Sequence, residues 1–359
     1  MVFARSASTL PESLRVGAAV SCFRLLAFCL AAAAGAALAQ ETAPPSGAST
    51  DASSPSDMTT LDSVTVTGEQ PGPGLWKVTR GDHTLWVLGV QYPLPKNMTW
   101  KAAEVQQAIA QSQVVIADAS AKPEIGFLHK LTLLPAVYSA RKNDGGKTLK
   151  DVLPADVYAR WQALKAKYVG NDDGIERLRP LVAANELYGK ALAKSGLARN
   201  GLIWDTIRGL AKKDHVKIIE PEASIPLDDP RQTIRDFKNT DVALDAQCLS
   251  ATMTRLETDL AAMRDRANAW AVGDVEALKK LPSPSQQEAC RAAVSSNPRL
   301  REQIDAALHR IDQTWLAAAE QALRDNPNSF AVLPMDELLR PDRRLAMLRE
   351  RGYAVEAPE

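Results

Sequence analysis

Three carboxylates stand where this chain could do chemistry, each at or just beyond the end of a predicted strand. Asp118 directly follows one apolar run, Glu220 ends a second, and Glu337 comes shortly after a third. Carboxylates without imidazole suit a hard cation such as Ca²⁺ or Mg²⁺ better than zinc. Tyr92, which follows another predicted strand, would add an acid or an oxyanion donor to such a site. These four residues are therefore the candidates for catalysis.

The same residues have a simpler interpretation, which we favour. Charged residues at strand ends are usually solvated, so we expect Glu220 and Glu337 to pair with Arg179 or Arg310 or to face water. On this interpretation the protein has no resident cofactor or metal, and a divalent cation is the alternative. The predicted binding cleft consists of Gly89, Gln91, Tyr92, Asp118, Arg179, Glu220, Arg310 and Glu337.

The stretch from Gly74 to Ser120 predicts the element that would position this cleft. Residues 75–79 and 84–90 are rich in β-branched and aromatic residues around a Gly-Asp turn, which predicts a hairpin. A helix from about Thr99 and a buried strand at 113–117 complete a βαβ unit. The loop after its first strand, Gly89–Tyr92, would open at the carboxyl edge of the sheet, where open α/β folds place their sites.

The rest of the chain predicts a mostly helical α/β fold with a small central sheet wrapped by many helices. Helical spacing covers 124–142 (broken by Pro135), 154–168, 181–194, 201–213 and most of 230–323, and a closing helix covers 336–351. Runs at 215–220 and 329–333 predict further core strands, with an edge strand near 353–355. We therefore expect one folded unit over residues 74–359.

Both ends of this unit resemble the TraB/GumN family. Leu75-Trp76-Lys77-Val78, Leu88-Gly89 and Leu94-Pro95 match the opening pattern of that family, and Leu345-Ala346-Met347-Leu348 with Arg351-Gly352-Tyr353 match its closing helix. The resemblance implies an α/β fold and a cleft built from a His after the first strand, a Glu ending the second and a His in a late Gly-Ala-Gly-His-Leu segment. Some relatives are thought to be metal-dependent hydrolases or proteases.

The positions of those three family residues are changed in this chain. They are occupied by Tyr92, Ala117 and Glu337, and Pro334 stands where the late segment has a glycine. A catalytic zinc needs about three protein ligands, and alanine supplies none. The resemblance therefore implies a binding or regulatory protein on a degenerate metal site. The alternative is a metal-dependent hydrolase or peptidase-like enzyme with a site rebuilt from carboxylates.

The first 73 residues predict export and a linker. Residues 1–39 have basic residues, a short apolar run and the small-x-small pattern Ala37-Leu38-Ala39, which predicts a signal peptide cleaved before Gln40 and a periplasmic protein of a Gram-negative cell. Residues 40–73 are rich in Ser, Thr, Pro and Gly and predict a disordered linker. Within them, Leu61–Gly68 alternates apolar and polar residues and resembles the TonB-contacting segment of outer-membrane receptors. A partner-binding role for this segment is a second alternative.

Charge and cysteine content limit the partners. The leader contains three Arg and one Glu, so the exported chain would have a net charge near −2 and no basic character for nucleic acid. We expect no membrane span after cleavage and an unidentified periplasmic or envelope protein as partner.

The exported chain keeps two cysteines, Cys248 and Cys290, which we expect to form a disulfide. No zinc-type histidine pair, Gly-x-Ser-x-Gly elbow or nucleotide-binding loop occurs in the sequence.

Overall fold

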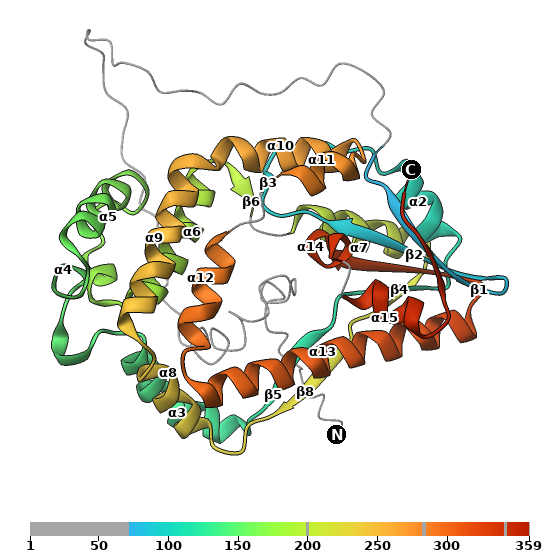
Figure 1. Cartoon of the computed structure of the whole chain (residues 1–359). Coiled ribbons are helices and arrows are strands. Elements are labelled where there is room, and N and C mark those ends of the chain that lie inside the picture. The colour runs from blue at the N-terminus through green and yellow to red at the C-terminus, as the bar shows by residue number, and fades with distance from the viewer. Residues whose placement is uncertain (1–71, 199–200, 282–284, 341–342, 359) are drawn as a thin grey trace, which may run out of the picture.

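A computed structural model describes residues 72–198, 201–281, 285–340 and 343–358 (Figure 1). The predicted leader and the segment Leu61–Gly68 lie outside the described residues. Gly72 and Pro73, the last residues of the predicted linker, are both buried. No helix in the described part of the chain is long and apolar enough to cross a membrane.

A mixed six-stranded sheet forms one side of the molecule, in the order β10-β1-β2-β9-β4-β7. β1 and β2 form the predicted antiparallel hairpin, and Gly81 takes a φ of 63° at the first turn position, which a glycine adopts without strain. β2, β9, β4 and β7 run parallel to one another. The strands are β1 Leu75–Arg80, β2 His83–Val90, β4 Val114–Ile116, β7 Lys217–Ile219, β9 Asn328–Pro334 and β10 Ala354–Glu356.

The predicted βαβ unit consists of β2, helix α2 (Ala103–Ala110) and β4. Its two strands are not neighbours, because β9 from the far end of the sequence is inserted between them and pairs with both. The carboxyl ends of β2, β9 and β4 therefore meet at one edge of the sheet. The α/β fold class with a small sheet and many helices is confirmed, since the structure is 60% helical.

Two sequence predictions were wrong in detail. The helix expected at 124–142 is preceded by β5 (Ser120–Glu124), which pairs in parallel with β8 (Glu222–Pro226), and α3 (Phe127–Ala140) runs through Pro135 without a break. The closing helix is two helices, α14 (Met335–Leu339) and α15 (Arg344–Glu350). Arg340 is extended with ψ 131°, as expected of a residue that precedes proline, so α14 cannot continue through Pro341.

A second core lies in a helical lobe on the opposite side of the molecule from the sheet (Figure 1). It packs α5, α6, α9 and α12 around Trp161, Leu187 and Leu249. The long helix α13 contributes Leu300 and Ile304 to this core and Ala307, Ile311 and Trp315 to the sheet core. The helices of the lobe and its connections are α4 Leu149–Val152, α5 Ala155–Tyr168, α6 Pro180–Lys194, α8 Pro230–Lys238, α9 Val242–Thr258, α12 Ser285–Val294 and α13 Pro298–Asp325.

Helices α7 Leu202–Lys213, α10 Leu260–Ala271 and α11 Val275–Lys280 pack near the sheet, and the remaining short elements are β3 Leu94–Pro95, β6 Leu197–Ala198 and the 3₁₀ turns at Asp144–Gly146 and Asp173–Arg177.

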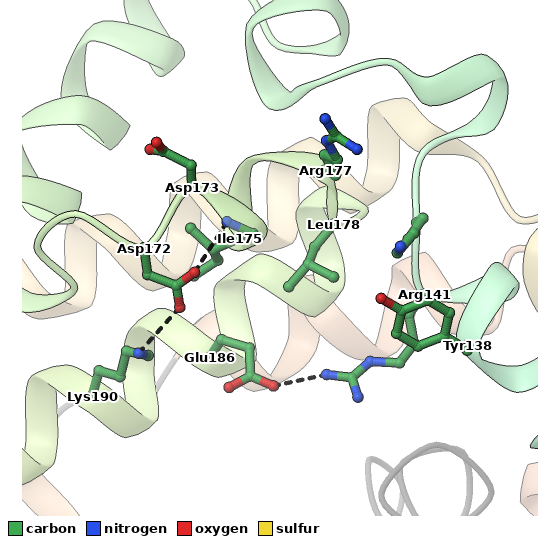
Figure 2. A pocket seen from close by; sticks show the side chains of 11 residues that line it. Tyr138, Arg141, Asp172, Asp173, Ile175, Arg177, Leu178, Glu186 and Lys190 are labelled. Carbon is green, nitrogen blue, oxygen red and sulfur yellow. Dashed lines mark hydrogen bonds and ion pairs between the residues drawn. The ribbon is translucent and has the colours of Figure 1, made fainter. Parts of the chain in front are cut away.

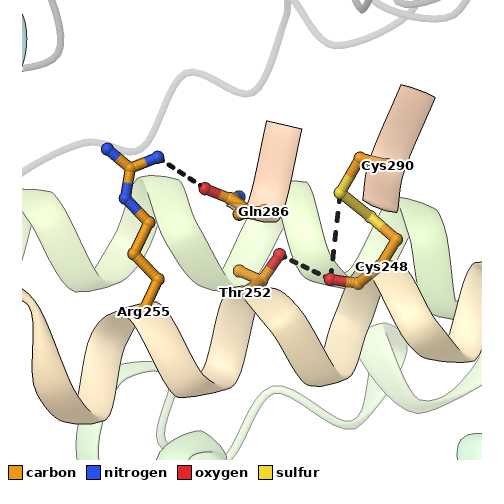
Figure 3. The surroundings of a disulfide bond; sticks show 5 residues. All are labelled: Cys248, Thr252, Arg255, Gln286 and Cys290. Atoms are coloured by element: carbon orange, nitrogen blue, oxygen red, sulfur yellow. Dashed lines mark hydrogen bonds between the residues drawn. A yellow bond between two sulfur atoms is a disulfide. The ribbon is translucent and has the colours of Figure 1, made fainter. Parts of the chain in front are cut away.

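Helices α9 and α12 are joined by the predicted disulfide between Cys248 and Cys290 (Figure 3). Both sulfur atoms are buried in the helical core. Thr252 donates a hydrogen bond of 2.8 Å to the Cys248 carbonyl, and Arg255 donates one of 2.7 Å to Gln286 across the two helices. The bond closes a loop with a sequence separation of 42, which joins the two helices covalently.

Candidate functional site

Two of the predicted carboxylates converge at the carboxyl edge of the sheet. Asp118 lies two residues after β4, and Glu337 lies in α14, which directly follows β9. β4 and β9 are parallel neighbours, so their carboxyl ends lie side by side and bring the two side chains together.

Two arginines link these carboxylates to a third, Asp312 of α13. Arg344 donates from Nε to Asp312 at 2.8 Å and from Nη1 to Asp118. Arg343 lies 3.7 Å from Asp312 and 3.6 Å from Glu337. Arg344 is only 4% exposed. We call these five residues, Asp118, Asp312, Glu337, Arg343 and Arg344, the arginine–carboxylate cluster.

The cluster has three acidic and two basic groups in a largely buried position. Burial raises the pKa of Glu337, although Arg344 and Arg343 oppose the shift. Burial likewise raises the pKa of Asp118 against the opposing effect of Arg344. The pKa of Arg344 is also raised, because the carboxylates outweigh the burial of its own charge. Asp118 Oδ2 and Glu337 Oε2 have no hydrogen-bond partner among the described residues. A retained proton on one carboxyl group would balance the cluster.

Glu220 does not join this cluster. It follows β7, its side chain is 44% exposed, and it lies 3.7 Å from Arg208. Arg310 is exposed on α13. The partners that we expected for Glu220 and Glu337, Arg179 or Arg310, are thus replaced by Arg208 and Arg343.

Arg179 lies in the helical lobe, at the start of α6. It is 2% exposed and donates to Asp245 at 2.8 Å. It also donates to the carbonyl oxygens of Phe237, Lys238 and Thr240, at the C-terminal end of α8. A guanidinium there binds the free carbonyl groups and complements the negative end of the helix dipole. Arg179 therefore joins α6, α8 and α9.

The loop after β2 is packed against neighbouring helices. The Gly89 carbonyl accepts a hydrogen bond of 2.6 Å from the indole of Trp270 on α10. A Cβ at Gly89 would lie 2.6 Å from the terminal methyl of Met335 on α14, so that side chain would have to shift to admit a larger residue. Gln91 is buried and donates to the Tyr92 carbonyl at 2.9 Å, and Tyr92 packs partly buried against the sheet core. This loop is a packing element with one unsatisfied polar atom, Gln91 Oε1.

A family model described as the TraB/PrgY/gumN family matches residues 74–357. The chain belongs to the TraB/PrgY/gumN family. No curated protein and no solved structure matches it.

The catalytic-metal positions inferred for the TraB/PrgY/gumN family do not fit a metal in this chain. Ala117 is buried and has no ligand atom, and the oxygens of Asp118 and Glu337 contact guanidinium groups. In the part of the chain that the structure describes, no group of three His, Cys, Asp or Glu side chains is placed to hold a metal ion. A divalent cation would compete with Arg344 for the same carboxylates.

The sequence patterns did not predict three members of the cluster, namely Asp312, Arg343 and Arg344. Asp312 carried a usable signal, because it lies beside Ile311 and one turn from Trp315 on the buried face of α13. An acidic residue on a buried helix face requires a partner. The partner could not be deduced, because α15 is placed beside α13 only by tertiary packing.

A surface pocket of about 550 Å³ lies in the helical lobe, and none of the cluster residues lines it. Figure 2 shows the side chains around this pocket. Most of its charged groups pair with one another: Glu186 binds Arg141 at 2.9 Å, and Asp172 lies 3.5 Å from Lys190. Tyr138 forms one wall. Sequence patterns did not predict this pocket, because its walls come from α3, α6 and the turn at Asp173–Arg177.

Proposed function

We propose that this TraB/PrgY/gumN family member is an exported, non-catalytic binding or regulatory protein of the periplasm. The observation that carries the proposal is the position of Arg344 between Asp118 and Asp312, at the sheet edge where the family site is expected. A guanidinium with fixed carboxylate partners provides the positive charge that a metal would otherwise supply, and it provides no open coordination position.

The chemistry of the cluster supports this proposal. A general base or a metal ligand must present a free carboxylate lone pair to its target. Asp118 has one oxygen bound to Arg344 and a second, Oδ2, that is unpartnered but buried away from solvent, and Asp312 contacts both arginines. These side chains are suited to joining β4, α13 and α15 rather than to binding a substrate.

Thermal unfolding with divalent ions tests the proposal. We expect the protein, purified without chelators, to keep the same Tm when Mg²⁺, Ca²⁺, Mn²⁺ or Zn²⁺ is added and when EDTA is added. Asp118→Asn and Glu337→Gln are the matched variants. A stabilisation by one of these ions that EDTA reverses, and that either variant abolishes, would contradict the proposal and establish a metal site at the cluster.

A second function, an acid–base hydrolase, is favoured by one observation. The pKa values of Asp118 and Glu337 are both raised by burial, as a general acid requires. Glu220 has no part in such a site, because it pairs with Arg208 elsewhere. Assays on a panel of peptide and ester substrates distinguish the two functions. Turnover that is lost in Glu337→Gln would favour the enzyme, and we expect none.

The export part of the proposal is supported by the leader pattern and by the Cys248–Cys290 disulfide, which is typical of oxidising compartments. N-terminal sequencing of the chain from a periplasmic fraction would give Gln40 as its first residue.

The segment Leu61–Gly68 is proposed as a site for an envelope partner. Deletion of residues 40–71 should then abolish partner capture in the periplasm and leave the Tm unchanged.

A further inference from the structure

Helix α3 exposes a row of large apolar side chains. Phe127 is 74% exposed, Leu128 75%, Leu131 49% and Tyr138 57%. Leu134 is half-buried, and Pro135 is exposed between them. We call these six residues, Phe127, Leu128, Leu131, Leu134, Pro135 and Tyr138, the α3 stripe.

The stripe lies opposite the face by which α3 joins the helical core. At 100° per residue, the six side chains fall within one sector of the helix, and Leu133, Val137 and Ala140 fall on the other side. Those three are buried in the helical core, where α3 packs beside α8. α3 is thus apolar on two opposite faces, and only one of them is covered by this chain.

A surface helix normally has one apolar face toward the core and a polar face opposite it, so a second apolar face is normally covered as well. The α3 stripe contains no charged residue, and isolated apolar side chains on a surface do not line up over three turns. Its composition therefore indicates a surface that is covered in the working protein.

We propose that a second copy of this chain covers the stripe, with the two α3 helices antiparallel about a twofold axis. In this register Phe127 meets Tyr138 of the second copy, and Leu131 meets Leu134. The ends of the stripe are also complementary in charge. Glu124, three residues before the helix, is exposed, and Lys142 follows its end with Nζ 4.0 Å from the Tyr138 ring centroid. An antiparallel pair places each Glu124 beside Lys142 of the other copy, twice by symmetry.

The same charges disfavour a bilayer as the occupant. A membrane-surface helix has basic residues along the edges of its apolar face. Lys130 is the one Lys or Arg within α3, Arg141 and Lys142 follow its end, and the acidic Glu124 lies at the other end of the stripe. An anionic lipid surface would repel that carboxylate, whereas a second copy pairs with it.

Sedimentation equilibrium of the purified exported chain over about 1–100 µM tests the proposal. We expect a reversible dimer. Leu131→Glu should raise the dissociation constant by about 100-fold or more, because each copy would bury an unpaired carboxylate. The matched control is Ala136→Glu, which adds the same charge to an exposed position of α3 outside the stripe and should leave the dimer intact. Equal melting temperatures would show that both variants fold.

A charge exchange tests the register itself. Glu124→Lys and Lys142→Glu should each weaken the dimer, and the double variant should restore it. A wild-type chain that stays monomeric at the highest concentration overturns the proposal, and so does a dimer that survives Leu131→Glu. Binding of the monomer to anionic vesicles, lost in Leu131→Glu, would overturn it in favour of a membrane surface.

Discussion

Arg344 binds Asp118 across a sequence separation of 226 residues, and the contact joins the end of β4 to α15. The Arg344 guanidinium also lies 5.7 Å from the centroid of the Trp315 ring. A buried arginine with two carboxylate partners is costly to remove, because Asp118 would lose its cationic partner and Asp312 would keep only Arg343, at 3.7 Å.

Arg344→Met should lower the free energy of unfolding by about 3–5 kcal/mol, the usual cost of removing one partner of a buried ion pair. The matched control is Arg351→Met, just after α15, where the half-exposed arginine pairs with Glu320 at 3.0 Å. We expect that loss to be within about 1 kcal/mol. Denaturant unfolding measures both variants, and equal losses would mean that the cluster does not stabilise the fold.

The pKa of Glu337 makes stability depend on pH. Burial raises this pKa above its usual value of 4.5, so the folded protein holds the proton more tightly than the unfolded chain. The contribution to stability is therefore complete below about pH 4.5 and is lost as the pH rises through the raised pKa. Glu337→Gln removes this loss, so its stability relative to wild type should increase from pH 4 to pH 8. Glu350→Gln, on the exposed side of α15, is the control.

Asp245 should give a second pH effect, in the helical lobe. Burial raises its pKa to about 6, although Arg179 opposes the shift. The sign is the same: stability is greatest below the usual value of 3.8 and falls by roughly 2–3 kcal/mol as the pH rises to about 6. Asp245→Asn should remove this fall while keeping a hydrogen-bond acceptor for Arg179. The free energy of unfolding of both proteins is measured from pH 4 to pH 7. If it falls with pH as steeply in Asp245→Asn as in wild type, the assignment to Asp245 is wrong.

The disulfide should stabilise the helical lobe. Replacing Cys248 and Cys290 together by alanine should cost about 2–4 kcal/mol, the usual contribution of a bond that closes a loop of this length. Denaturant unfolding of the wild type with and without reductant should reproduce the difference. If reduction leaves the unfolding midpoint unchanged, the bond is not formed in the purified protein.

The sequence predicted those parts of the fold that depend on local patterns. The hairpin from Leu75 to Val90 and the strand around Val115 follow from β-branched spacing, and the helices of the lobe follow from apolar spacing. β5, with sequence Ser-Ala-Lys-Pro-Glu, has no β-branched residue and forms because β8 pairs with it. No local signal could have identified such a strand.

The site was predicted in part, for a related reason. Asp118 and Glu337 could be found because both follow parallel, neighbouring strands, whose carboxyl ends meet. Glu220 follows a strand of the same sheet, but β7 is the edge strand, and its carboxylate pairs with Arg208. Arg343 and Arg344 are recognised only when α15 is seen to pack beside α13, a tertiary contact that sequence spacing does not encode.

The position of β9 has a consequence for how the chain is made. This strand lies between β2 and β4 in the middle of the sheet, yet it is encoded at residues 328–334. During synthesis from the N-terminus, the hairpin and β4 emerge early and have no central strand to pair with. The sheet core cannot close until nearly the whole chain has left the ribosome. The sheet, unlike the helical lobe, therefore stays incomplete for most of the synthesis, and the proposed export through a narrow translocation channel would require such an incompletely folded chain.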